Sequence, residues 1–189
     1  MNKAGIGIVC ALAVAAAAAT TAVAQELSEK SVKTFMNYAW SLVPSQFTPP
    51  SGKTIVIDKK KKDEILIPVD AAREVIRIGR LSAHAQICDL KAEQVCNYQS
   101  MMRREVDKKS WTDQQLVYIS QLHLTTVMML TGKIKLVEKD GDKEVQVEEK
   151  ASPVAQTCTQ EQKDKVSEVI YTYVKAGPEL KGGACEFKK

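Results

Sequence analysis

The hydrophobic residues of this chain recur mainly at the three- and four-residue spacing of amphipathic α-helices. Within residues 28–43 the apolar positions form one stripe, which comprises Val32, Phe35, Met36, Ala39, Trp40 and Val43. The stripe predicts a helix that ends before Pro44, because the residue before a proline avoids helical geometry. The following segment, through Pro49, Pro50 and Gly52, has turn residues and no period, so we expect a loop there.

Two short β-branched runs come next, at residues 54–58 and 65–67. We expect these runs to pair as a small hairpin. Four consecutive lysines, residues 59–62, separate them and precede Asp63 and Glu64. Because the acidic residues offset the positive charge, a solvated loop is favoured over a contact with an anionic surface.

Helical periodicity then continues from Pro68 to about Lys109. A single straight helix of this length would be about 60 Å long, which exceeds the width of a domain of this size. We therefore expect a break in this region. Asp89 is the favoured position, since its side chain can cap a new helix, and Gly79 is the weaker alternative.

The strongest local signal is the start of a helix at Thr112. Thr112 and Gln115 form a capping box, while Trp111 and Leu116 are spaced as a hydrophobic staple. The helix is expected to run to Gly132, a suitable left-handed terminator. Apolar residues occupy nearly all of its faces, which predicts that it is the central and most buried helix.

Two more elements are expected near the C-terminus. Residues 133–147 alternate in polarity around an Asp-Gly-Asp turn, which predicts a hairpin; an EF-hand calcium loop is disfavoured because its other ligands are missing. A linker at Ser152 and Pro153 precedes a helix that opens with a second capping box, Thr159 and Gln162. The stripe of this helix comprises Val166, Val169, Ile170, Tyr173 and Val174, and the helix should end at Gly177 and Pro178.

Taken together, these patterns predict a mainly α fold of four to six helices with one or two small peripheral hairpins. Residues 25–189 have the length of a single domain, with a short polar tail from about residue 178. The first 24 residues differ in kind, because Lys3 precedes an apolar run that ends in Ala22, Val23 and Ala24. This is the pattern of a cleaved secretory signal peptide, with an uncleaved membrane anchor as the alternative.

Export changes how the remaining residues are interpreted. We expect a periplasmic or secreted protein that begins near Gln25 and has no later membrane-spanning segment. Without Lys3, 26 of the 27 Lys and Arg residues remain against 23 Asp and Glu, a net charge of +3. A charge so small and so dispersed does not favour nucleic acid as a partner.

Four cysteines follow the leader, and an even number in an oxidising compartment predicts two disulfides. They are Cys88, Cys96, Cys158 and Cys185. In an unbroken helix Cys88 and Cys96 would lie about 12 Å apart, too far for a disulfide, but a break near Asp89 would let them approach. All three pairings therefore stay open. Cys185 has the strongest case for a bridge, because only a bridge would order the polar tail.

Reactive residues are few. His84 and Cys88 are spaced to share a helix face, and with Met101 and Met128 they would suit Cu or Zn handling, although a disulfide is the favoured use of the thiol. His123 lies within the most apolar helix, which favours a buried, hydrogen-bonded imidazole over a general base.

The sequence contains no recognisable nucleophile elbow, zinc-protease motif, phosphate loop or Cys-x-x-Cys pair, so we expect no cofactor and assign no catalytic residue. A non-enzymatic binding or structural protein of the cell envelope, with another envelope protein as partner, is the leading hypothesis. The alternatives are soft-metal handling, a His123-dependent hydrolase or transferase, and an inhibitor or chaperone that offers the hairpin edge around Ile134 and Val145.

Overall fold

The computed structural model describes residues 27–49, 52–134, 137–140, 143–146, 158–179 and 185, and gives only the backbone between 137 and 146. Within these residues the chain forms six α-helices, one 3-10 turn and two antiparallel sheets of two strands each. This confirms the mainly α fold with small hairpins. The predicted leader and the predicted linker at Ser152 and Pro153 lie outside the described residues.

The first helix, α1 (Glu29–Leu42), has the predicted bounds. Ser28 begins it by accepting a hydrogen bond from the backbone N–H of Ser31, and it ends before Pro44. Its buried residues, Val32, Met36 and Ala39, belong to the predicted stripe. The Lys59 ammonium group donates to the carbonyls of Trp40 and Val43 at the C-terminal end of α1 and lies 4.8 Å from the centroid of a Trp40 ring. One residue of the predicted solvated lysine loop therefore caps a helix.

The predicted hairpin between residues 54–58 and 65–67 is wrong. Strand β2 (Ile55–Val56) pairs with β1 (Gln46–Phe47), in the segment expected to be a loop. The chain reverses at Gly52, which has a positive φ of 85° and donates its N–H to the Pro49 carbonyl. Asp58 then accepts from the Lys60 N–H and starts the turn η1 (Lys59–Lys61), so the lysines lead into a helix rather than joining two strands.

The second β-branched run contributes instead to the core. It begins at the end of the short helix α2 (Lys62–Ile65), where Ile65 is buried, and Ile67 is buried just beyond it. Asp63 and Glu64 lie in the first turn of α2, where negative charge complements the helix dipole. A run of three residues is too short to show, without its neighbours, whether it forms a strand or anchors a helix end.

The long helical region breaks at Asp89 as predicted, into α3 (Val69–Ile87) and α4 (Lys91–Asp107). The role of Asp89 differs from the expected one. Its φ is 58°, and the Leu90 N–H donates to the Ala85 carbonyl, which is the hydrogen bond of a helix C-terminus. The N-cap of α4 is Leu90, which makes no side-chain capping bond. Gly79, the alternative break, lies inside α3.

Helix α5 (Asp113–Leu130) begins with the predicted capping box between Thr112 and Gln115, and Gly132 follows it with a positive φ of 69°. Strands β3 (Val137–Asp140) and β4 (Lys143–Gln146) form the predicted second hairpin. Helix α6 (Gln160–Lys175) has its own capping box between Thr159 and Gln162, as predicted. Its stripe is less buried than predicted, because Ile170 is the residue of α6 that is fully buried and Val169 is exposed.

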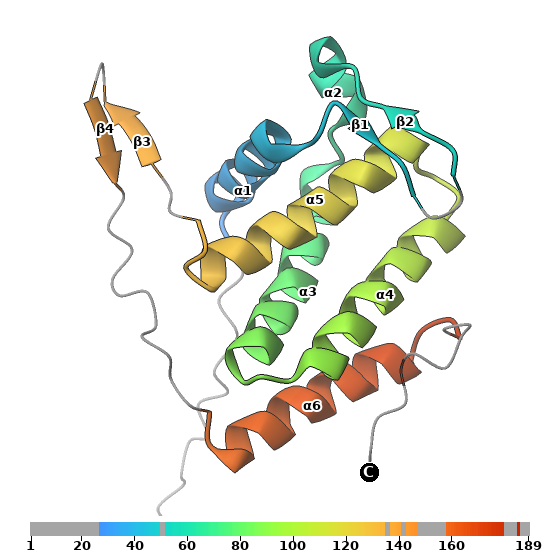
Figure 1. Ribbon diagram of the computed structural model, residues 1–189, viewed down its shortest axis with the longest axis vertical. Helices are drawn as coiled ribbons and strands as arrows, with labels where there is room; N and C mark the ends of the chain where they lie inside the picture. The colour runs from blue at the N-terminus through green and yellow to red at the C-terminus, as the bar shows by residue number, and fades with distance from the viewer. Residues whose placement is uncertain are drawn as a thin grey trace, which may run out of the picture.

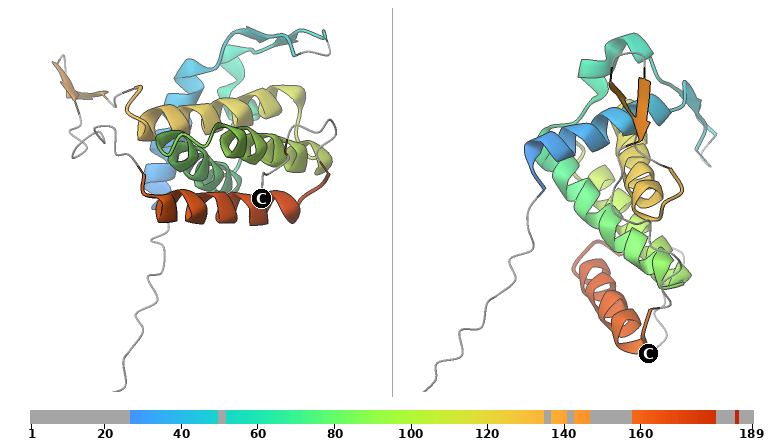
Figure 2. Two further views of the ribbon diagram at one scale, coloured as in Figure 1. Left: turned by 60° about the horizontal axis from the view of Figure 1, so that its bottom comes forward. Right: turned by 90° about the vertical axis from the view of Figure 1, so that its left-hand side faces the viewer.

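The helices are arranged in layers, with α3 and α5 crossing at the centre (Figure 1). Helix α1 covers one side of this pair and α4 the other, and α6 packs on the outside against α4 and α3 (Figure 2). The predicted central helix thus shares the centre with α3. The main core is built from α1, α3, α4, α5 and the segment around α2, and its largest fully buried side chains include Tyr118, Ile65, Ile76, Ile78, Met101, Ile119 and Leu122.

The capping box of α5 is exposed, so its contribution can be measured with little effect on packing. We expect Thr112→Ala to lower the free energy of unfolding by about 1 kcal/mol, because the N–H of Gln115 loses its acceptor. Urea denaturation measures this loss. Thr112→Ser keeps the hydroxyl group and should retain most of the stability; an equal loss in both variants would assign the effect to the methyl group rather than the cap.

Candidate functional site

Helices α3 and α5 approach each other closely where they cross at Gly79. A Cβ atom added to Gly79 would lie 2.8 Å from Cβ of Thr126 and 2.9 Å from its Cγ2. Only glycine leaves room for this contact, so Gly79 sets the distance between the two central helices. The backbone carbonyl of His123 lies 3.4 Å from the same position, so this histidine is near the crossing.

His123 is held in a buried hydrogen-bonded network. Its Nε2 lies 2.9 Å from the Ser82 hydroxyl, and the Asn97 amide donates to the same hydroxyl over 2.8 Å and to the Ile78 carbonyl over 2.9 Å. Because Ser82 Oγ already accepts from Asn97, its proton is available for His123 Nε2. That donation requires the neutral tautomer with its proton on Nδ1; the tautomer protonated on Nε2 would instead donate to Ser82 Oγ, since a hydroxyl oxygen can accept two hydrogen bonds. The network joins α3, α4 and α5 and confirms the predicted buried, hydrogen-bonded histidine.

The surroundings of His123 favour its neutral form. Burial lowers the pKa of His123 to about 4, because the charged imidazolium would lose its hydration. The Tyr98 ring packs 5.1 Å from the imidazole, centroid to centroid, and the Tyr98 hydroxyl lies 2.8 Å from that of Ser120. At neutral pH the imidazole is therefore uncharged.

A serine hydroxyl directed at a histidine nitrogen is also the arrangement of a nucleophile and its base. Here, however, Ser82 has no exposed surface and His123 is 5% exposed, so a substrate could not reach the oxygen without opening the helix interface. Among the described residues, His123 has no carboxylate hydrogen-bonded to its ring that would orient it. The geometry accounts for the joining of three helices, which is a structural role.

A second buried polar contact was not anticipated from the sequence. Glu105 is 6% exposed and accepts hydrogen bonds from the Lys108 ammonium group and from the Trp111 indole N–H, at 2.8 and 2.7 Å. It thereby holds the turn between α4 and α5. The signal that could have revealed Ser82, Asn97 and Glu105 is that each is a polar residue on an otherwise buried helix face.

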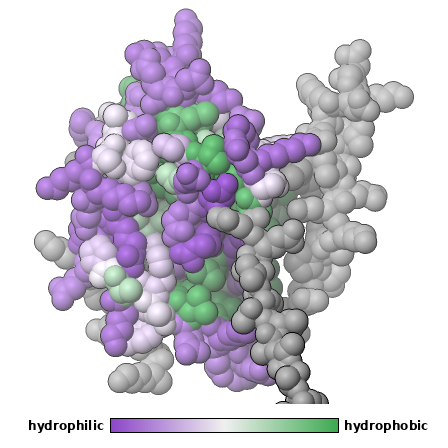
Figure 3. Space-filling view, turned by 180° about the vertical axis from the view of Figure 1, so that it is seen from behind, coloured by the Kyte–Doolittle hydropathy of each residue, from purple (hydrophilic) through white to green (hydrophobic). Residues whose placement is uncertain are grey.

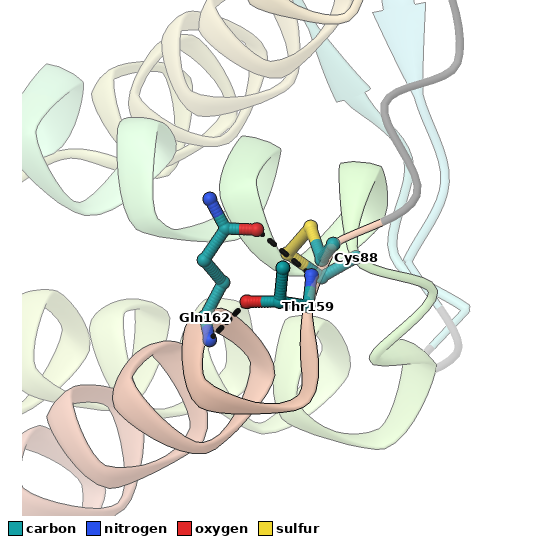
Figure 4. The surroundings of a disulfide bond; sticks show 4 residues. Cys88, Thr159 and Gln162 are labelled. Atoms are coloured by element: carbon teal, nitrogen blue, oxygen red, sulfur yellow. Dashed lines mark hydrogen bonds between the residues drawn. A yellow bond between two sulfur atoms is a disulfide. The ribbon is translucent and has the colours of Figure 1, made fainter.

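The four cysteines form two disulfides, Cys88 with Cys158 and Cys96 with Cys185. Cys88 and Cys96, at the α3–α4 helix pair, are therefore not bonded to each other, and each pairs with a cysteine that flanks α6. This is one of the three arrangements that the sequence left open. Cys158 directly precedes Thr159, so one disulfide lies beside the capping box of α6 (Figure 4). The other joins Cys185 of the predicted tail to the second turn of α4, in agreement with the expected bridge at that cysteine.

The residues of the soft-metal alternative lie on three helices. His84 is exposed on α3, Met101 is buried in the core on α4, and Met128 is half-buried on α5. Neighbouring atoms that displace water from one side of the ring, and then the charge of Arg80, lower the pKa of His84. The Cys88 sulfur is bonded to Cys158 and is no thiolate ligand in this state. Within the described part of the chain, no three His, Cys, Asp or Glu side chains are grouped as a metal site.

No helix in the described ranges combines the length and the apolar character needed to cross a bilayer. Comparison with known proteins returns no family, no curated relative and no solved structure that this chain matches.

Proposed function

We propose that this protein is exported, processed near Ala24, and serves as a non-enzymatic binding or structural protein of the cell envelope. The observation that carries the proposal is the structural use of its reactive groups. His123, Ser82 and Asn97 join three helices, and the four cysteines are paired. Two disulfides support export, since such bonds persist mainly in oxidising compartments.

The surface that we assign to binding is the end of the molecule formed by β1 and β2, which projects beyond the helix layers (Figure 2). Val56 is 64% exposed, the highest value among the large hydrophobic residues described, and Phe47 is 42% exposed. Lys60 and Lys61 are exposed close by in the chain. Because Phe47 pairs with Ile55 and Val56 pairs with Gln46, the two apolar side chains lie on opposite faces of this ribbon. Exposed apolar side chains with lysines nearby in the chain complement a protein partner that encloses the ribbon with apolar and acidic residues.

Elsewhere the described surface alternates between hydrophobic and hydrophilic areas. On the back of the molecule, hydrophobic side chains gather in small areas separated by hydrophilic ones (Figure 3). Other exposed hydrophobic side chains, such as Val95 and Val106 on α4, lie outside the β1–β2 end and provide controls of similar size.

Binding is tested by capture from an envelope extract with the purified, oxidised protein. We expect Phe47→Ser together with Val56→Ser to abolish capture of a partner, and Val95→Ser together with Val106→Ser to preserve it. Capture should also weaken as salt is raised, because the lysines contribute to it. Equal capture by both double variants would contradict the assignment of this surface.

Export is tested separately by the intact mass of protein recovered from the periplasmic fraction. The expected product begins near Gln25 and has no free thiol. An unprocessed N-terminus, or four reduced cysteines in natively isolated protein, would contradict the proposed location.

The hairpin supports a second candidate, an inhibitor or chaperone that binds another protein's strand. In the described residues β3 pairs with β4 alone, from Val137 with Gln146 to Asp140 with Lys143, so each strand has an outer edge without a strand partner. Such edges accept a further strand. Replacing residues 137–146 with a glycine-serine linker of equal length should abolish capture if the hairpin is the site, and leave it unchanged if the β1–β2 end is.

A further inference from the structure

Helix α6 is weakly integrated into the hydrophobic core. Ile170 is the residue of α6 that is fully buried, and Tyr173 is the one that packs, partly buried, against the main core cluster. That cluster is otherwise made by residues from α1 to α5 and by the segment between α1 and α3. The described helices other than α6 therefore keep a shared core that does not depend on it.

Disulfides flank α6 on both sides. Cys158 comes immediately before the Thr159 N-cap and is joined to Cys88 at the C-terminal end of α3, as Figure 4 shows. Cys185 follows α6 in the chain and is joined to Cys96 of α4. Both covalent links therefore run to the α3–α4 pair, the surface on which α6 lies.

The polar contacts between α6 and α4 are few. Ser167 donates to a Glu93 carboxylate oxygen over 3.1 Å, and the Arg104 guanidinium donates to the Tyr173 carbonyl over 2.6 Å while lying 4.4 Å from the Tyr173 ring centroid. Glu93 is near the start of α4 and Arg104 near its end, so the two helices run in the same direction.

The α4 surface beside this contact contains unsatisfied polar atoms. Asn97 Oδ1, Ser100 Oγ and Arg104 Nε are buried without a hydrogen-bond partner among the described residues. Ser100 and Arg104 lie one helical turn apart on α4, whereas the Asn97 amide belongs to the network with Ile78 and Ser82 of α3. Burying a polar atom costs free energy when nothing replaces its hydration.

From these observations we propose that α6 is a redox-controlled cover. Closed disulfides hold it on the α3–α4 pair, and reduction of Cys88–Cys158 releases it and uncovers the stripe that contains Ser100 and Arg104. The helices from α1 to α5 stay folded, since their core lacks a fully buried contribution from α6.

The reductant is a dithiol. Its thiolate attacks the sulfur of Cys158, a half-buried residue, rather than that of Cys88, which is buried, and the Cys88 sulfur leaves and takes up a proton. The second thiol of the reductant then attacks the mixed disulfide, forming a disulfide in the reductant and releasing Cys158 as a thiol. Two electrons and two protons pass to the protein for each bond opened.

Hydrogen exchange of the whole processed chain, followed by mass spectrometry, tests the proposal. Treatment with dithiothreitol should lower the protection of the α6 amides by about 100-fold or more, while the central amides of α3 and α5 keep theirs. The proposal is overturned if α6 keeps its protection after complete reduction, or if α3 and α5 lose theirs together with α6.

Two double variants separate the disulfides. Cys88→Ser with Cys158→Ser should release α6 without any reductant, whereas Cys96→Ser with Cys185→Ser should leave α6 protected, because Cys185 is remote from the helix in sequence. Release of α6 in the second variant and not in the first would contradict the assignment of control to Cys88–Cys158. Exchange is measured without a partner, so failure here leaves the proposed binding function to its own test.

Discussion

Lowering the pH from 7 to 4 is expected to reduce the free energy of unfolding by about 3 kcal/mol through His123 alone. Burial lowers the pKa of His123 from 6.5 to about 4 in the folded protein. Between these two values the unfolded chain binds a proton that the folded chain does not. The stability that depends on a neutral His123 is therefore complete above about pH 6.5, declines as the pH falls, and is lost near pH 4.

Protonation would also disturb the network around the imidazole. In the charged imidazolium both ring nitrogens donate, so the Ser82 hydroxyl would have to accept from both Asn97 and His123 and find another acceptor for its own proton. Urea denaturation at intervals between pH 7 and pH 4 measures the effect.

The control for this prediction is His123→Gln, which keeps a polar side chain but does not titrate. It should be less stable than the native protein at pH 7, and the difference should shrink as the pH falls. Carboxylates titrate in both proteins, so the difference between the two curves isolates the histidine. His84→Gln, at an exposed position, should retain most of the pH dependence; parallel curves for the native protein and His123→Gln would refute the prediction.

Gly79→Ala is expected to destabilise the protein by about 1–3 kcal/mol, although alanine favours helices over glycine by about 1 kcal/mol. The added methyl group would lie 2.8 Å from Cβ of Thr126, an atom fixed to the backbone of α5. The two central helices would have to separate, with a loss of packing on both sides of the crossing. Urea denaturation at neutral pH measures the change.

Gly177 offers a matched control. An added Cβ there would lie 2.7 Å from a nitrogen of the Arg104 guanidinium, which is the end of a flexible side chain and can move. We expect Gly177→Ala to cost less than Gly79→Ala. A second test combines Gly79→Ala with Thr126→Gly, which removes the opposing atoms and should cost less than the sum of the single changes. Additive losses would show that the close approach is not the cause.

Several features of the fold were predictable because their causes lie within a few residues of one another. The capping boxes at Thr112 and Thr159 involve a residue and its neighbour three positions later, and both helices begin where predicted. Pro44 ends α1 by a steric effect on the preceding residue. The break at Asp89 followed from the length of the periodic segment, although its left-handed conformation did not.

The candidate site could be predicted only in part, because its residues come from distant positions in the chain. The sequence indicated that His123 would be buried, but its partner Ser82 is 41 residues away in the chain and Asn97 reaches the same hydroxyl from a third helix. The hairpin assigned to residues 54–58 and 65–67 failed for a similar reason. Its first run pairs instead with Gln46 and Phe47, because the chain reverses at Gly52.

The features that the sequence determined and those that only the tertiary structure decided differ in how far apart in the chain the interacting residues lie. Helix ends, turns and buried faces arise from hydrogen bonds and steric contacts between near neighbours, and the order of residues is enough to specify them. The pairing of Cys88 with Cys158 and of Cys96 with Cys185 joins residues 70 and 89 positions apart. Such contacts, like the approach of α3 to α5 at Gly79, depend on how all the helices pack at once, and no local pattern encodes that packing.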